Sequence, residues 1–193
     1  MRLFELTQPL TEAKNDTVVF TFGRFNPPTI GHQKLVEKVQ AVAAQADADH
    51  VIFLSQSHKS GKDPLPWKDK VALFRKMFPA ANVSTQTKVI NPYVAMEELG
   101  KKYDNVIMVV GSDRVAQFES QMQKYLEGWE IENFQVVSAG ERDPDADGAE
   151  GMSASKARQL AVSGNFAAFA QALPSSVNNA TKKIVYNTIR NNQ

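Results

Sequence analysis

The chain has 193 residues, of which 42% are hydrophobic and 22% charged, and this suits a single domain with one buried core. Its 22 basic and 21 acidic residues leave a net charge of +1, which gives no reason to expect general binding to nucleic acids or membranes. There is no cysteine, so disulfides, zinc–thiolate sites and thiol catalysis are excluded. The sequence has neither an apolar run long enough to span a membrane nor a secretory signal, and we expect a cytoplasmic protein.

The chain is predicted to consist of a leader and one domain. Residues 1–16 are interpreted as a leader or short appendage, because the first strong strand signal comes only after them. In residues 17–193, strands are expected at 17–22, 50–54, 105–110 and 134–137, with a weaker one near 83–87. Helices are expected at 33–45, 67–78, 92–102, after Gly111, from Ser153 and at 175–190. This alternation predicts an α/β fold, with a Rossmann-like parallel sheet of about five strands, helices on both faces and further helices at the C-terminus.

The loop GRFNPPTIGH, which follows the first predicted strand, is the most informative segment. Parallel sheets bind ligands beyond the carboxyl ends of their strands, which is where this loop would lie. Gly23 allows a tight turn, and Thr29 or Gly31 lies near a helix start, where free backbone N–H groups favour an anion. His32 would lie in the first helical turn, and Arg24 adds a permanent charge. The loop therefore predicts a phosphate site, although it contains neither the dinucleotide-binding GxGxxG pattern nor a Walker phosphate loop.

Two later segments offer groups of the same kind. In GMSASKAR, Ser153 or Ser155 can cap a helix N-terminus, which brings backbone donors together with Lys156 and Arg158 in a cluster suited to a polyphosphate. GSDR follows the strand expected at 105–110 and is a second candidate for nucleotide contacts. The alternative for GSDR is that Ser112 or Asp113 simply caps a helix.

The sequence GRFNPPTIGH resembles the signature of the nucleotidylyltransferase superfamily, whose T/H-x-G-H motif corresponds here to Thr29, Ile30, Gly31 and His32. The flanking GRFNPP is similar to nicotinamide-mononucleotide adenylyltransferases. GMSASKAR resembles the superfamily's I-S-x-T-x-x-R motif, with Ser155 in place of the usual threonine. The resemblance implies transfer of a nucleoside monophosphate, AMP from ATP, to a small phosphorylated acceptor with release of pyrophosphate. Nicotinamide mononucleotide is the expected acceptor, and Mg²⁺ is expected on the phosphates and water, with no dedicated metal-binding residues.

The resemblance also assigns roles to individual residues. His32 would stabilise charge on the α-phosphate, Thr29 would help to hold the phosphates, and Arg158 would hold the departing pyrophosphate. Asp113 would contact the nucleotide, for example at a ribose hydroxyl. The set expected to bind nucleotide comprises Gly23, Arg24, Phe25, Gly31, Gly111, Asp113, Ser153, Ser155 and Lys156.

The acceptor is expected at the segment SQSHKSGKDPLPW, which resembles the S-H-x-x-x-N-P-F loop of archaeal-type nicotinamide-mononucleotide adenylyltransferases. His58, Lys59 and Lys62 are candidates for binding the acceptor's phosphate or the triphosphate, and Trp67 for stacking on a planar ring. Two positions depart from the pattern, since Asp63 stands in place of Asn and Leu65 in place of Phe. Trp67 has the alternative role of a core residue.

Several alternatives stay open. The same chemistry could serve phosphopantetheine, glycerol phosphate or a sugar phosphate, with CMP or AMP as the transferred group. A different class is a noncatalytic nucleotide sensor or nucleotide-binding virion protein. The stretch Leu10–Ala13 resembles the L-x-E cleavage sequence of capsid-targeting leaders in T-even-like phages, which would imply cleavage between Glu12 and Ala13 and a phage-encoded, packaged protein. A frayed terminus or a short docking helix is the alternative for the leader. The expected partners are small nucleotides, and a homo-oligomer is possible because many relatives form oligomers.

Overall fold

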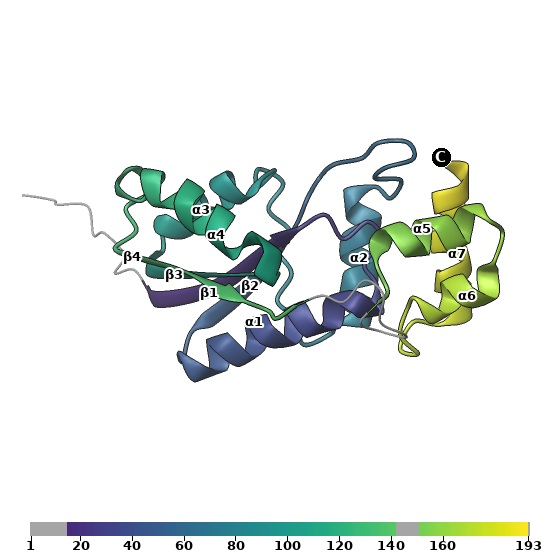
Figure 1. Ribbon diagram of the computed structural model, residues 1–193, viewed down its shortest axis with the longest axis horizontal. Coiled ribbons are helices and arrows are strands. Elements are labelled where there is room, and N and C mark those ends of the chain that lie inside the picture. Colours follow the sequence, from purple (N-terminus) through teal and green to yellow (C-terminus); the bar gives the residue numbers. More distant parts are fainter. Residues whose placement is uncertain (1–14, 142–150, 193) are drawn as a thin grey trace, which may run out of the picture.

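The computed structural model describes residues 15–141 and 151–192, and within these ranges four parallel strands form one sheet (Figure 1). The strands are β1 (Asn15–Gly23), β2 (Asp49–Leu54), β3 (Tyr103–Val110) and β4 (Asn133–Ser138). Their order across the sheet is β2-β1-β3-β4, and every neighbouring pair is parallel. The Rossmann-like α/β fold predicted from the sequence is confirmed.

The start of the domain differs slightly from the prediction. β1 begins at Asn15, which pairs with Tyr103, so the last two residues of the predicted leader belong to the sheet. Residues 1–14, including the predicted cleavage position between Glu12 and Ala13, lie outside the described residues.

The weak strand expected near 83–87 is reduced to a single parallel bridge between Ile52 and Val83. Val83 is buried, whereas the next four residues are partly or fully exposed. One buried side chain cannot anchor a strand, since strand stability comes from packing one face against the core. The described sheet therefore has four strands instead of about five.

Helices cover both faces of the sheet, as Figure 1 shows. α1 (Gln33–Gln45) and α2 (Trp67–Met77) pack on one face, while α3 (Pro92–Gly100) and α4 (Val115–Met122) pack on the other. Strand β1 contributes to both faces, because successive side chains of a strand point to opposite sides. Val18 and Phe20 join the cluster beneath α3, and Val19 joins the cluster beneath α1.

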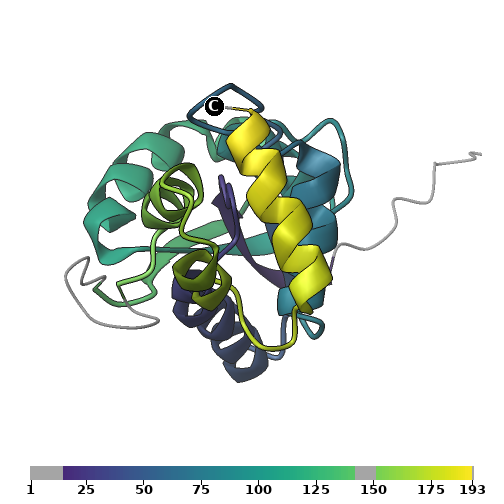
Figure 2. The ribbon, with the colours of Figure 1, turned by 90° about the vertical axis from the view of Figure 1, so that its right-hand side faces the viewer.

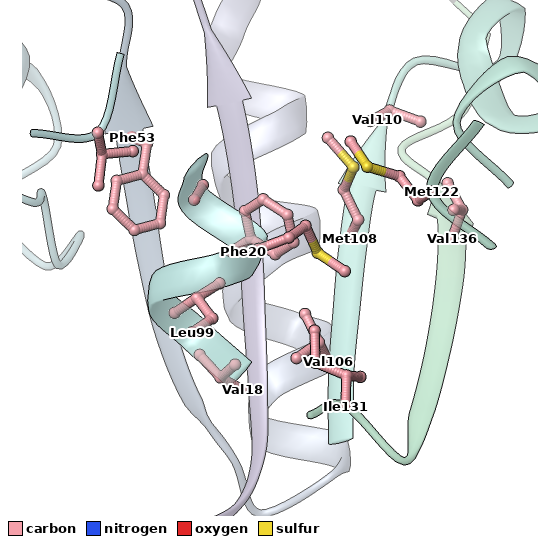
Figure 3. Packing of buried hydrophobic residues seen from close by; sticks show 13 residues of the cluster. Val18, Phe20, Phe53, Leu99, Val106, Met108, Val110, Met122, Ile131 and Val136 are labelled. Carbon is pink, nitrogen blue, oxygen red and sulfur yellow. The ribbon is translucent and has the colours of Figure 1, made fainter. Parts of the chain in front are cut away.

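The cluster on the α3 side is the larger support for β1 (Figure 3). Phe20 lies in its middle, with Phe53 on one side and Met108 on the other. The rings of Phe20 and Phe53 meet edge to face with centroids 6.2 Å apart. This packing holds β1 rigidly, and with it the loop that leaves the strand at Gly23.

The C-terminal helices form a separate group at one end of the sheet (Figures 1 and 2). They are α5 (Ala154–Val162), α6 (Phe166–Gln171) and α7 (Asn179–Asn191), and they share a core with the buried side of α2. The short α6 was not predicted from the sequence. Helix α7 begins four residues later than the predicted Ser175, because Asn178 caps it by accepting the Thr181 N–H at 2.8 Å. Within the described ranges, none of the helices is both long and apolar enough to cross a membrane.

Candidate nucleotide-binding site

An open cavity of about 1040 Å³ lies beyond the carboxyl ends of β1, β3 and β4. The chain leaves β1 towards β2 on one side of the sheet and returns through β3 on the other, so the cavity marks the point where the strand order reverses. Open parallel sheets bind ligands at such a switch point. Its lining includes Gly23 and Arg24 after β1, Gly111 and Asp113 after β3, and Ser153 before α5.

The loop after β1 folds into a short 3-10 turn, Ile30–His32, directly before α1. Thr29 precedes this turn and is fully buried. Its backbone N–H donates to Nδ1 of His32 at 3.0 Å. Because an N–H can only donate, Nδ1 carries a lone pair, and the neutral imidazole has its proton on Nε2. His32 lines the cavity, so the loop presents a ring N–H donor beside it.

Phe25 supports the histidine from behind. Its ring centroid lies 4.8 Å from that of His32 and 5.0 Å from that of Phe74 in α2. Phe25 takes a left-handed backbone conformation with φ of 44°, which a bulky residue adopts only where the surroundings enforce it. Gly23 makes room for this arrangement, since a Cβ at that position would come within 2.5 Å of the Phe25 ring. Phe25, predicted as a nucleotide contact, lines the cavity but is 98% buried, with 2% of its surface exposed, and packs chiefly against aromatic rings.

The second predicted motif meets the first. The Thr29 hydroxyl donates to the carbonyl of Met152 at 3.1 Å, which joins the loop to the start of α5. Ser153 caps α5 by accepting the Lys156 N–H at 2.9 Å, as one of the two predicted alternatives required. Ser153 and Ser155 line the same cavity as His32. The free N–H groups of the α5 N-terminus therefore lie at the cavity wall beside the histidine loop.

Arg158 is held against the loop after β1 and does not line the cavity. Its guanidinium donates to the carbonyl of Asn26 at 2.6 Å and to the Ser155 hydroxyl at 3.1 Å. Burial lowers the pKa of Arg158, with the charge of Asp63 opposing this effect and that of Arg24 adding to it. A guanidinium stays protonated in proteins, and its five donors exceed the two acceptors engaged here. Arg158 thus holds the loop after β1 in place, and it has further N–H donors next to the cavity.

The GSDR segment forms a 3-10 turn, Ser112–Arg114, before α4. No side chain caps this turn, so the helix-capping alternative for Ser112 or Asp113 does not describe it. Gly111 and the exposed Asp113 both line the cavity. Asp113 also lies 4.0 Å from Arg114 of the same turn, a distance at which the two exposed charges interact weakly.

The residues predicted to bind the acceptor lie outside this cavity, whose described lining contains none of His58, Lys59, Lys62 and Trp67. The three polar ones are exposed on the loop between β2 and α2. Trp67 is half-buried, packs against the core on the α1 side, and donates its indole N–H to the carbonyl of Leu54 at 3.1 Å. Trp67 therefore corresponds to the core-residue alternative.

Lys156 and Thr29, which were predicted to contact the nucleotide, are also absent from the lining of the cavity. Lys156 is exposed and Thr29 is buried.

Two buried polar residues near the loop were missed by the sequence reasoning. Asn26 forms a two-way pair with the backbone of Leu65, donating to its carbonyl at 3.1 Å and accepting its N–H at 2.9 Å. Lys70 of α2 is completely buried and donates to backbone carbonyls of two loops. The helical spacing was the available signal for the lysine, because Lys70 lies one turn before Phe74 on the apolar face of α2.

The cavity has further lining residues that the motifs did not indicate, among them Lys34 of α1, Phe118 of α4 and Glu141 after β4. Among residues 15–141 and 151–192, there is no group of three or more His, Asp or Glu that could hold a metal ion. The charges at the cavity wall are thus of both signs, and the partial positive charge at helix N-termini adds to the attraction for an anion.

A cavity at the switch point of a parallel sheet, with helix N-termini and a ring N–H donor at its wall, defines a nucleotide-binding protein of the Rossmann-like class. Residues 20–160 match the family described as cytidylyltransferase-like, and because this is well over half of the chain, the chain belongs to that family. The nucleotidyltransferase class predicted from the sequence is thereby confirmed.

The chain is also similar to individual proteins and solved structures. A protein of Acholeplasma laidlawii, assigned as a nicotinate-nucleotide adenylyltransferase, is 25% identical over 133 residues; the match covers 60% of this chain and 62% of the relative's length. A solved structure of nicotinic acid mononucleotide adenylyltransferase from Plasmodium falciparum, complexed with APC, is similar with a TM-score of 0.58 at 13% identity, covering 90% of this chain and 98% of that one. A structure from Vibrio parahaemolyticus, assigned as a nicotinate-nucleotide adenylyltransferase, gives a TM-score of 0.56 at 14% identity, covering 89% and 99%. At these identities the two structures establish the shared fold.

Proposed function

We propose that the protein transfers AMP from MgATP to a pyridine mononucleotide and releases pyrophosphate. The observation that carries this proposal is the hydrogen bond from the Thr29 N–H to Nδ1 of His32, which puts the ring proton on Nε2 of a residue that lines the same cavity as the α5 N-terminus. The names of the relatives, all adenylyltransferases of nicotinate mononucleotide, support the choice of AMP and of a pyridine nucleotide.

The reaction requires placement and charge stabilisation instead of a protein nucleophile. A phosphate oxygen of the acceptor attacks the α-phosphorus of ATP in line, and the bond from this phosphorus to the oxygen that bridges to the β-phosphate breaks. Pyrophosphate leaves with the electron pair. The Nε2–H of His32 donates to a non-bridging oxygen of the α-phosphate, where negative charge accumulates. A Mg²⁺ bound to ATP would be held by phosphate oxygens and water, and it would offset part of their negative charge.

Several groups would hold the departing pyrophosphate. Ser153 and Ser155 offer hydroxyls and the helix N-terminus at the cavity wall, and the spare donors of Arg158 lie beside them. Arg24, which is exposed and lines the cavity, adds a cation. Thr29 contributes by position: its buried hydroxyl and N–H bind Met152 and His32, so it sets the distance between the two motifs without touching phosphate. Gly111 and Asp113 lie where they can contact the nucleoside.

Two pyridine mononucleotides are candidates for the acceptor. The sequence resemblance favours nicotinamide mononucleotide, whereas the names of the relatives favour nicotinate mononucleotide. The two differ by one negative charge on the pyridine ring substituent, so direct competition between them reports which one the cavity prefers.

The test is a pyrophosphate-release assay that crosses ATP and CTP with nicotinamide mononucleotide, nicotinate mononucleotide, phosphopantetheine and glycerol 3-phosphate, with products identified by mass spectrometry. We expect turnover with ATP and a pyridine mononucleotide, and a dinucleotide product. Turnover only with CTP or with a non-pyridine acceptor would reject the proposed substrates in favour of another transferase. Tight ATP binding without turnover on any acceptor would indicate a noncatalytic nucleotide-binding protein, the alternative that includes a virion component.

A further inference from the structure

Lys70 has an environment that the reaction described above does not explain. The side chain is completely buried in α2, with 0% of its surface exposed. Its Nζ lies 3.2 Å from the carbonyl oxygen of Arg24, 2.5 Å from that of Ser55 and 3.4 Å from that of Ser57. An ammonium group has three N–H donors, so these three carbonyls can use its whole donor capacity. Burying a cation is costly unless such partners are present.

The carbonyls belong to two different loops at the carboxyl edge of the sheet. Arg24 directly follows β1 and lines the nucleotide cavity, whereas Ser55 and Ser57 follow β2. Ser55 N–H also donates to the carbonyl of Gly23 at 2.8 Å, so the two loops are joined both by this bond and by the ammonium. Lys70 is not among the residues that line the cavity, which places it behind the wall.

We infer that Lys70 is a positioning residue for nucleotidyl transfer: by holding the main chain of Arg24 against the loop after β2, its ammonium fixes the segment that leads to His32. The next residue, Phe25, carries the left-handed backbone and packs on the His32 ring, so a shift at Arg24 is transmitted to the imidazole over one residue. The inference rests on the proposed function for its rate measurements.

Among the described residues, Asp63 is the charged group that acts on the ammonium, and it is linked to two further charges, because Asp63 and Arg24 both act on Arg158. Asp63 belongs to the loop after β2, Arg158 to α5 and Arg24 to the loop after β1; the charge of Asp63 acts on both Lys70 and Arg158. Burial lowers the pKa of Lys70 to about 8, with Asp63 opposing the effect. Above this pH the side chain becomes a neutral amine with two donors, and its hold on three carbonyls weakens.

Two substitutions separate the donors from the charge. Lys70→Met keeps an unbranched side chain, one atom shorter than lysine, and removes every donor, whereas Lys70→Arg keeps a cation that does not lose its proton in this range. Arg75→Met is the matched control, because Arg75 also lies on α2 and also donates to a backbone carbonyl, that of Val83, but away from the cavity. The measurements are kcat and KM for ATP from about pH 6 to about pH 10, with thermal unfolding of each variant over the same range.

Wild-type kcat/KM is expected to fall on the alkaline side with an apparent pKa near 8. In Lys70→Arg, this fall of kcat/KM at alkaline pH should be absent. In Lys70→Met it should also be absent, and kcat/KM should be about 10²-fold lower than in wild type at neutral pH, since displacing a reacting group by about 1 Å costs this much. Thermal stability should move in the opposite direction. The unfolded chain binds the Lys70 proton up to about pH 10.5, so from about pH 8 to about 10.5 wild type should gain stability relative to Lys70→Met while its activity declines. Arg75→Met should keep the wild-type pH profile.

A Lys70→Met variant with wild-type kcat, KM and pH profile would overturn the inference. The inference would also be overturned if kcat/KM fell at alkaline pH in Lys70→Arg as it does in wild type. This second test remains valid even if Lys70→Met fails to fold. If wild type shows no turnover with any acceptor, the proposed function fails by itself. The dissociation constant for a non-hydrolysable ATP analogue then tests the role of Lys70. Weaker binding above about pH 8 in wild type but not in Lys70→Arg supports the inference, and the same pH dependence of binding in both proteins rejects it.

Discussion

His32 has two ring nitrogens with separate tasks, and two substitutions address them one at a time. In His32→Asn, the amide oxygen stands at the same bond separation from the main chain as Nδ1 and can still accept the Thr29 N–H, which His32 now accepts at 3.0 Å. The distal donor at Nε2 is lost. In His32→Gln, the amide nitrogen stands at the position of Nε2, but the acceptor for Thr29 is lost. The pair therefore separates the proposed chemistry from the local structure.

The expected magnitudes follow from these contacts. Loss of a single donor to a developing oxyanion costs about 10²–10³ in rate, so His32→Asn should lower kcat by this factor with little change in melting temperature. His32→Gln leaves the N–H of a residue that is 0% exposed without its partner, at a cost of about 1–3 kcal/mol. For a chain of this length, each kcal/mol lowers the melting temperature by about 2–4 °C. His32→Gln should thus be the less stable but the faster of the two variants.

Single-turnover kinetics with saturating ATP, together with thermal unfolding monitored by circular dichroism, measure both effects. If His32→Asn turns over at the wild-type rate, the ring does not stabilise the transition state and the proposed site is wrong. If His32→Gln is as stable as wild type, the hydrogen bond from Thr29 does not fix the tautomer. The Arg75→Met variant serves again as a control, since its side chain lies away from the cavity.

Three further predictions concern the framework of the site. Gly23→Ala should cost about 1–3 kcal/mol and also slow the reaction, because the new methyl group would come within 2.5 Å of the buried Phe25 ring; unchanged melting temperature and kcat would contradict this account of the loop. Phe20→Ala should lower the free energy of unfolding by about 3–5 kcal/mol in urea titrations, since Phe20 is fully buried in the middle of its cluster, and a loss below about 1 kcal/mol would show that the cluster is loosely packed. Hydrogen bonds from Lys101 and Lys88 lower the pKa of Glu98 below its ordinary 4.5, so Glu98→Gln should destabilise by about 1 kcal/mol or less above that pH. The difference should vanish as the pH falls through the folded-state pKa, because the stabilisation of a carboxylate is lost when it takes up a proton. A difference that grows on acidification would mean that these ion pairs do not stabilise the fold.

Local patterns were enough to predict most of the framework. The run from Thr17 to Phe22 reads as a strand because it is apolar on both faces, and β1 is indeed the strand that packs against both helical layers. The stripe of Val36, Val39 and Val42 identifies α1 to the residue. The segment 83–87 failed as a strand because only its first residue has a core to pack against, which depends on neighbours that the local sequence does not contain.

The candidate site was predictable in its motifs but not in its supports. The loop GRFNPPTIGH and the capped start of α5 lie together as the motifs required. The residues predicted to bind the acceptor lie outside the described lining of the cavity, and their role stays a prediction, because a resemblance along one loop says little about the direction in which that loop folds. The burial of Lys70 could have been inferred from its place on the apolar face of α2, but its contacts could not, because its acceptors are backbone carbonyls, which every residue possesses.

The hydrogen bond from Ile30 to the carbonyl of Ala172, together with that from Thr29 to Met152, has a consequence for synthesis of the chain. A nascent polypeptide that has emerged only as far as β4 already contains the complete sheet, yet the histidine loop still lacks both of these partners. Binding of nucleotide should therefore begin late in translation, when α5 and α6 have left the ribosome. Stalled chains of increasing length, probed with a photoreactive ATP analogue, should acquire labelling abruptly after residue 172 has emerged, well after the strands have paired.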